Sequence, residues 1–180
     1  TDSAGYYAEL ADRRKCIIQE IFWNQEAGFF FDYNIEESKL SEVYTLAGVY
    51  PLYFAIATKD QAEKLADRLH EKFLQEGGLV TTLEQTGEQW DAPNGWAPLQ
   101  WIAIIGLENY DFDGFATLLA QNWLNLNTDI YRKTGKMMEK YNVSDPDIPG
   151  GGGEYPSQDG FGWTNGVFLG LLAKGYSPGN

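Results

Sequence analysis

The chain has 180 residues, a length that suits one domain and allows a substantial buried core. Its 26 acidic and 13 basic residues give a formal net charge of −13, which argues against nucleic acid and against an anionic membrane surface as partners. Cys16 is the only cysteine, which excludes an internal disulfide framework and a cysteine-rich metal site.

The first half of the chain predicts three helices around a short irregular segment. Apolar residues recur at helical spacing over residues 3–22, which indicates a first helix. Residues 23–40 break this periodicity and favour a short strand or turn region. Residues 42–57 are apolar nearly all round and predict a buried second helix. Thr58 and Gln61 have the spacing of a capping box, so a third helix is expected to follow and to end before residues 77–78.

The second half predicts two long loops separated by helices. The loops are expected at 77–94 and 142–159, and the helices at about 95–108, 111–126, 128–140 and 160–173. Asp111 or Asp113 is the expected cap of the 111–126 helix, and Gly135 weakens the 128–140 helix.

Some of the predicted helices are joined by only one or two residues. These short links, within 42–57/59–76 and within 95–108/111–126, predict antiparallel helical hairpins. The loops between the pairs are longer than compact packing needs, and such loops are usually functional. The pattern therefore predicts an all-α fold, either part of an α/α toroid or a plain helical bundle.

The loop before the fourth helix carries a segment that we call the tryptophan motif, residues 89–98, with the sequence Gln-Trp-Asp-Ala-Pro-Asn-Gly-Trp-Ala-Pro. Carboxamides and carboxylates hydrogen-bond hydroxyl groups, and an indole face packs on the C–H face of a pyranose. The motif therefore suits a sugar pocket. The alternative is a helix start, with Asn94 as the cap and the tryptophans in the core.

The second loop carries the glycine motif, residues 149–166, in which four consecutive glycines precede Glu154 and Tyr155. Glycine allows backbone conformations and close approaches that other residues do not. A phosphate cradle is disfavoured because no Lys-Ser/Thr pair follows and Glu154 would repel phosphate. A flexible linker is the other alternative, but the aromatic residues that follow are too specific for a spacer.

Glu139 lies between the two motifs, where a weak helix ends, and a solvated helix-end carboxylate is its default interpretation. Glu154 follows fifteen residues later, across the glycines, so the two carboxylates could meet at one site. Paired carboxylates are the usual equipment for glycoside hydrolysis.

Taken together, these segments resemble the trehalase family. The tryptophan motif matches a signature of that family throughout, and residues 150–167 match its C-terminal pattern. Glu139-Lys140-Tyr141 stands where the family has Glu-Lys-Tyr. The resemblance covers essentially the whole chain, and the order and spacing of the three segments agree.

The resemblance implies that residues 1–180 form the C-terminal part, about half, of an (α/α)6 toroid that hydrolyses α,α-trehalose to two glucose molecules with inversion. It implies no metal and no organic cofactor. It makes Glu139 the general base and implies further sugar-contacting or supporting residues, namely Glu154, Gln89, Trp90, Asp91, Trp163 and Phe161.

The family's general acid is an Asp in a Ser-Gly-Trp-Asp segment, which this sequence lacks, as it lacks the Pro-Gly-Gly-Arg-Phe signature. We therefore expect the missing N-terminal part of the toroid as a partner, besides a neutral disaccharide. Asp91 is an alternative acid. The isolated chain is expected to be inactive, so a non-catalytic sugar-binding or structural fragment is a second reading, and another α/α-toroid glucosidase is a third.

Some expectations concern residues outside the motifs. His70 is expected on the surface, and Cys16 is expected to pack as a small apolar side chain. No apolar run is long enough for a membrane span, and the first residues show no signal-peptide pattern. The compartment therefore stays open.

Overall fold

The computed structural model describes residues 3–179. The prediction that the chain does not start with a signal peptide concerns the first residues and lies partly outside this range. Within this range the helices are α1 (Ser3–Ile21), α2 (Tyr50–Tyr53), α3 (Lys59–Arg68), α4 (Ala97–Glu108), α5 (Asp113–Thr134) and α6 (Gly162–Ala173). A 3-10 turn, η1 (Leu46–Val49), precedes α2, and a π-helical turn, η2 (Leu69–Phe73), extends α3. None of the helices in residues 3–179 combines the length and apolar character that crossing a bilayer requires.

Between these helices, two-residue strands pair antiparallel. The pairs are β1 (Trp23–Asn24) with β2 (Phe29–Phe30), β3 (Tyr33–Asn34) with β4 (Lys39–Leu40), β5 (Leu74–Gln75) with β6 (Gly78–Leu79), and β7 (Asn94–Gly95) with β8 (Tyr141–Asn142). The first three pairs join neighbouring segments. The β7–β8 pair joins segments more than 40 residues apart, so it determines where the two motifs meet.

The capping box predicted before α3 is confirmed. The Thr58 hydroxyl accepts from the Gln61 N–H at 3.2 Å, and the Gln61 carboxamide oxygen accepts from the Thr58 N–H at 2.9 Å. Two N–H groups that the helix itself cannot satisfy thus gain partners. The start of α3 is therefore encoded locally.

The predicted helix over residues 42–57 is confirmed only over its middle, where η1 runs directly into α2, and is wrong at both ends. The Leu46 N–H donates to the Thr81 carbonyl at 2.7 Å, which holds the chain before η1 extended against a distant loop. Ala55, with φ at +52°, ends the helical path after α2. A buried apolar segment is compatible with either conformation, and this tertiary bond selects the extended one.

The separate helix predicted over residues 128–140 is also wrong, because α5 continues without a break to Thr134. Gly135 ends it in the left-handed conformation, with φ at +70°, and its N–H donates to the Tyr131 carbonyl at 2.7 Å. Gly135 is thus an ordinary glycine C-cap, and it ends the fifth helix rather than interrupting a sixth. The N-cap of α5 is Phe112, which lies between the two expected caps.

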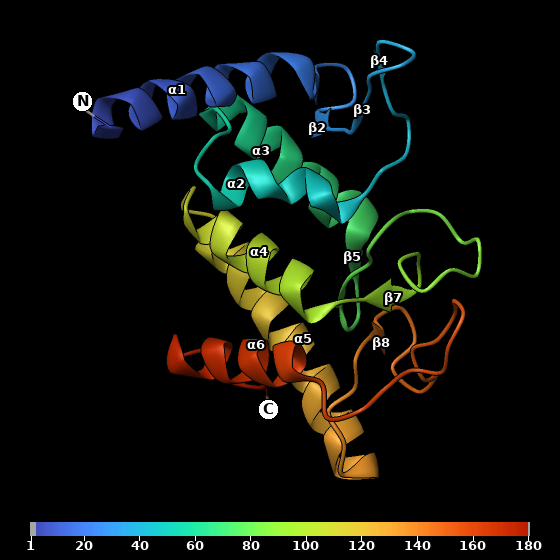
Figure 1. Ribbon diagram of the computed structural model, residues 1–180. Helices are drawn as coiled ribbons and strands as arrows, with labels where there is room; N and C mark the ends of the chain where they lie inside the picture. The colour runs from blue at the N-terminus through green and yellow to red at the C-terminus, as the bar shows by residue number, and fades with distance from the viewer. Residues whose placement is uncertain (1–2, 180) are drawn as a thin grey trace.

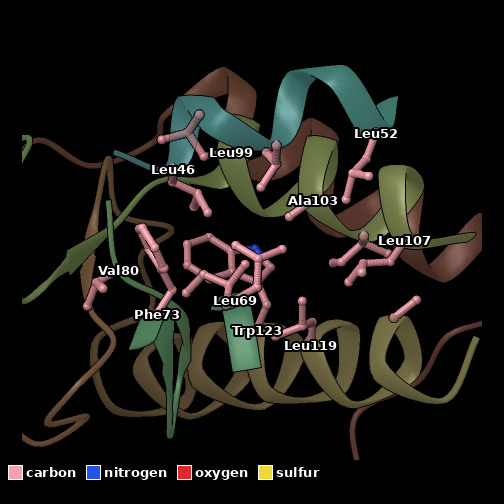
Figure 2. Packing of buried hydrophobic residues seen from close by; sticks show 14 of the residues in the cluster. Leu46, Leu52, Leu69, Phe73, Val80, Leu99, Ala103, Leu107, Leu119 and Trp123 are labelled. Carbon is pink, nitrogen blue, oxygen red and sulfur yellow. The ribbon is translucent and has the colours of Figure 1, made fainter. Parts of the chain in front are cut away.

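The core is built around α4, which packs against α2, α5 and α6. Figure 2 shows Leu107 of α4 on the side of Leu119 of α5, while Leu99 of α4 lies near Leu46 of η1. Burying one such leucine contributes about 1.5–3 kcal/mol to stability. Gly106 allows α2 to lie close, because a Cβ there would stand 2.8 Å from Leu52 Cβ. The predicted pairing of helices 95–108 and 111–126 corresponds to the observed α4–α5 pair.

Helix α1 lies across the top of the molecule in Figure 1 and buries none of its described residues. It is attached mainly near its end, where the Gln19 carboxamide donates to the Ile56 carbonyl and the Gln61 carboxamide donates to the Gln19 carbonyl. Cys16 on this helix is exposed, so its predicted packing as a core side chain is wrong. The predicted exposure of His70 is confirmed.

The loops that carry the two motifs lie side by side at one edge of the molecule. Figure 1 shows the chain before β7 and the chain after β8 next to each other, away from the exposed length of α1. The helices thus form a scaffold, and the candidate site is built on the loops at one end of it.

Candidate active site

The β7–β8 pair brings the two motifs together. Gly95 pairs with Tyr141, and Asn94 pairs with Asn142. A Cβ on Gly95 would lie 2.5 Å from Val143 Cγ1 and would prevent this approach. The glycine in the tryptophan motif is therefore required by the packing of the two loops.

A second connection joins the motifs through the Asn94 carboxamide. It donates to the Gly151 carbonyl at 2.7 Å and accepts from the Gly151 N–H at 3.2 Å. The Gly153 N–H adds a bond to the Gly87 carbonyl at 3.0 Å. A Cβ on Gly152 would stand 2.6 Å from the Gly87 oxygen, so the glycine run provides the close approach that its sequence indicated. The structure excludes Asn94 as the helix cap, because Trp96 holds that position.

Glu139 is buried at the junction, with 3% of its surface exposed, so its default reading as a solvated helix-end carboxylate is wrong. Its Oε2 accepts from Lys140 Nζ at 2.9 Å, and its Oε1 accepts from the Tyr155 hydroxyl at 3.0 Å. Both carboxylate oxygens are thus held by neighbours from the site itself, and the oriented carboxylate has the form expected of a general base.

The backbone around Glu139 is held from several directions. The Glu139 N–H donates to the Gln158 carbonyl at 2.8 Å, and the Trp163 indole N–H donates to the Glu139 carbonyl at 3.3 Å. The Met138 N–H donates to the Tyr141 hydroxyl at 2.9 Å, and burial raises the pKa of Tyr141 to about 12. The glutamate therefore sits on a rigid part of the loop.

Lys140 is the largest charged side chain in the interior, with 0% of its side chain exposed. Besides Glu139, its ammonium lies 3.3 Å from Gln89 Oε1, and it stands over the rings of Trp96 at 5.4 Å and Tyr155 at 5.2 Å. Gln89 of the tryptophan motif is therefore linked to Glu139 through this lysine. Sequence reasoning missed Lys140, although its place next to Glu139 in the Glu-Lys-Tyr segment was the available signal.

The indole rings form an aromatic wall beside this ion pair. Trp90 and Trp96 stack with centroids 3.9 Å apart, and Trp163 meets both edge-on at 6.5 Å and 5.4 Å. Phe161 packs on Trp163 at 4.9 Å. Trp96 is buried whereas Trp90 keeps 44% of its surface exposed, so Trp90 has a face available to a ligand. Both readings of the tryptophans hold in part, since one is core and one is surface.

Asp91 holds its own loop. Its carboxylate accepts from the Thr82 hydroxyl at 3.0 Å, from the Thr86 N–H at 3.2 Å and from the Thr86 hydroxyl. The Thr86 hydrogen bonds lower the pKa of Asp91, whereas a general acid needs a raised one. Its contacts are those of a supporting residue, and they argue against it as a substitute acid.

Glu154 differs from Glu139 in being exposed. Within residues 3–179 it has no hydrogen bond or ion pair to another side chain, so its carboxylate is free to meet a ligand. It adjoins Tyr155, whose hydroxyl contacts Glu139. No group of three or more His, Cys, Asp or Glu side chains in the described part of the chain is arranged to hold a metal ion.

Comparison with known proteins shows clear relatives. A protein-family model described as Trehalase matches residues 1–175. Periplasmic trehalases of Salmonella paratyphi B and Salmonella dublin are each 46% identical to this chain over 169 residues. The match covers 94% of this chain but only 30% of each relative. The chain thus spans about a third of the length of the curated relatives it matches.

Solved structures also resemble this one. The neutral trehalase of Saccharomyces cerevisiae has a TM-score of 0.79 and 32% identity, over 93% of this chain and 30% of that one. A GH63 mannosylglycerate hydrolase from Thermus thermophilus, in complex with glucose, has a TM-score of 0.64 and 23% identity, over 86% and 37%. The second likeness concerns the fold alone. The helical pairs form part of an (α/α)6 toroid, as the sequence predicted.

Proposed function

The chain belongs to the trehalase family, and on that premise we propose that residues 1–180 are the C-terminal part of the catalytic domain of an inverting α,α-trehalase. The complete enzyme would hydrolyse α,α-trehalose to two glucose molecules. The observation that carries the proposal is Glu139, a buried carboxylate with both oxygens oriented at the junction of the two motifs.

In this reaction Glu139 acts as the general base. It takes a proton from a water molecule whose oxygen attacks the anomeric carbon, and the C–O bond to the other glucose breaks on the opposite face. That leaving oxygen takes a proton from a general acid, so the balance is one water consumed and two glucose molecules released. Inversion requires the acid about 6.5–9.5 Å from the base. The contacts of Asp91 argue against it as this acid, so the acid is expected from the rest of the enzyme.

The other residues of the site bind the sugar or support those that do. Glu154 is exposed and free for sugar hydroxyls, and Trp90 offers an exposed indole face. Trp163 and Phe161 continue the aromatic wall, Gln89 reaches Lys140 with its carboxamide, and Asp91 holds the loop. A neutral disaccharide agrees with a chain whose formal charge is −13.

We propose that the partner of this chain is the remainder of the toroid, in line with relatives that are more than three times as long. Helix α1 leaves Tyr6, Tyr7 and Leu10 exposed, and α6 leaves Leu169 63% exposed. Single exposed apolar residues need no explanation, but a helix without one buried residue has an unused face. Packing against further helices of the toroid would cover the exposed apolar residues of α1 and of α6.

The test is Glu139→Gln in the complete enzyme, with Glu42→Gln as the matched control on an exposed glutamate. Glutamine keeps the shape of the side chain and removes its ability to accept a proton. We expect kcat for trehalose to fall by about three orders of magnitude or more, while circular dichroism and the control's kcat stay unchanged. Near-normal turnover by the Glu139 variant would contradict its role as the base.

A second candidate function, a non-catalytic sugar-binding or structural role of this chain by itself, is favoured by the exposed apolar faces and by the absence of a suitable acid among the described site residues. A glucose-release assay with trehalose on the purified chain separates the two, since robust release would show that the acid is present. A panel of other glucosides distinguishes trehalase from another toroid glucosidase.

A further inference from the structure

We propose that Lys140 is the positioning residue of the candidate base, whose carboxylate it holds in one orientation through a buried ammonium. The inference deepens the proposed function and rests on it. It starts from the placement of a fully buried lysine, which is among the rarest side chains in protein interiors unless it is paired.

The surroundings of the ammonium show what it connects. Its four neighbours are Oε2 of Glu139 at 2.9 Å, Oε1 of Gln89 at 3.3 Å, the ring of Trp96 at 5.4 Å and the ring of Tyr155 at 5.2 Å. These residues come from the tryptophan motif, the glycine motif and the segment between them. One cation therefore contacts every segment that builds the site.

A purely structural explanation accounts poorly for this arrangement. Removing an ammonium from water costs several kcal/mol, and a buried ion pair is often no more stabilising than an apolar pair of similar size. The surrounding tryptophan and tyrosine rings could pack around an apolar side chain instead. The charge is therefore best explained by what it does to Glu139.

The geometry of these bonds orients the carboxylate. The bond to Lys140 occupies Oε2 and fixes the side-chain rotation, which leaves Oε1 as the oxygen that meets the attacking water. Within the described residues, the side chain that bonds Oε1 is the hydroxyl of Tyr155, a residue that is 40% exposed.

Few titratable groups face Glu139. Lys140 approaches from its own segment and Tyr155 from the glycine motif, while Trp163 of α6 and Gln158 contribute uncharged groups to its backbone. Glu154 is next to Tyr155 in the chain and exposed. Among these neighbours Lys140 is the single cation, so its removal takes away the one charged partner of the carboxylate.

The test uses the complete enzyme with Lys140→Met, Lys140→Arg and, as control, Lys133→Met. Lys133 forms a surface ion pair with Asp147 at 2.9 Å, so its removal matches the chemical change but not the site. For Lys140→Met we expect kcat to fall at least about 100-fold with KM changed less than about threefold. The control should keep the wild-type kcat and KM.

Lys140→Arg keeps the positive charge but replaces the ammonium with a planar guanidinium group. We expect its kcat to be about 3- to 30-fold below wild type, with KM close to that of wild type. A folded Lys140→Met variant with wild-type kcat would overturn the proposal. If Lys140→Met fails to fold by circular dichroism, Lys140→Arg decides alone, and unchanged turnover by it would equally overturn the proposal.

Failure of the proposed function is recognised separately. If the wild-type enzyme releases no glucose from trehalose, the proposed function is wrong. The NMR line of the ¹³C-labelled Glu139 carboxyl then decides the role of Lys140 without turnover. We expect the line to broaden or split in Lys140→Met, because the carboxylate loses the bond that fixes Oε2. An unchanged line would contradict the positioning role.

Discussion

Asn94→Ala tests whether the two motifs form one site through the Asn94 carboxamide. The substitution removes the donation to Gly151 at 2.7 Å, the acceptance from the Gly151 N–H at 3.2 Å and the donation to the Gln89 carbonyl at 3.2 Å. The Gln89 carbonyl keeps the Trp96 indole N–H at 3.0 Å, so the loss falls chiefly on Gly151. The glycine motif should therefore loosen while the tryptophan motif stays in place.

The magnitude follows from these bonds. Each net hydrogen bond is worth about 1 kcal/mol, and water can reach half-buried Gly151 and replace part of what is lost. We therefore expect Asn94→Ala to reduce the free energy of local opening by about 2–3 kcal/mol. With a factor of ten for about each 1.4 kcal/mol, hydrogen exchange at the Gly151 and Gly153 amides should become about 30- to 150-fold faster.

Hydrogen–deuterium exchange with mass spectrometry measures this directly on peptides that span the glycine motif. The control is Asn122→Ala, which removes one bond of 3.3 Å from a half-buried asparagine of α5 to the Gln75 carbonyl. It should cost less than about 1 kcal/mol and leave the glycine motif unchanged. Unchanged exchange at Gly151 in the Asn94 variant would refute the view that this carboxamide holds the motifs together.

Two further predictions concern the same loops. Gly150→Ala should reduce the free energy of unfolding in urea by about 2–3 kcal/mol, because the new Cβ would lie 2.8 Å from the Lys140 carbonyl oxygen. The control is Gly151→Ala, whose Cβ would have no atom within 4 Å and which should stay within about 0.5 kcal/mol of wild type. Equal effects of the two substitutions would contradict this packing. Asp91→Asn should lose about 1 kcal/mol at pH 7, because Asp91 accepts from Thr82 on one oxygen and from Thr86 on the other, whereas asparagine has a single acceptor oxygen. Because these bonds lower the pKa of Asp91 below 3.8, its contribution is present above about pH 4 and disappears as the pH falls through the lower folded-state pKa. Urea unfolding at pH 7 and pH 2.5 measures the loss, and an equal difference from wild type at both values would count against the assignment.

The parts of the fold that depend on neighbours in sequence could be predicted. The capping box of Thr58 and Gln61 needs only four residues, and it lies where expected. The helices over 95–108 and 160–173 were found within two residues of their observed starts, because long periodic apolar patterns are a local signal. The sequence predicts the end of the fifth helix too early, because a single glycine such as Gly135 is compatible with an interruption as well as with a stop.

The failures occurred where a distant segment decides the conformation. Residues 42–57 are apolar enough for a buried helix, yet the bond from Leu46 to Thr81 keeps the chain before η1 extended. Cys16 lies on a helix whose described residues include none that is buried. Its exposure depends on what packs against α1, and nothing in the residues around it specifies that.

By itself, the sequence identified the two motifs, the α4–α5 helical pair and the glutamate between the motifs, because each depends on a short or periodic local pattern of side chains. Only the tertiary structure decided that Glu139 is buried, that Lys140 faces it, and that Asp91 supports a loop. The Asn94–Gly151 contact spans 57 residues and the Lys140–Gln89 contact spans 51. Such partners are chosen by the packing of loops on a helical scaffold, which no local pattern encodes.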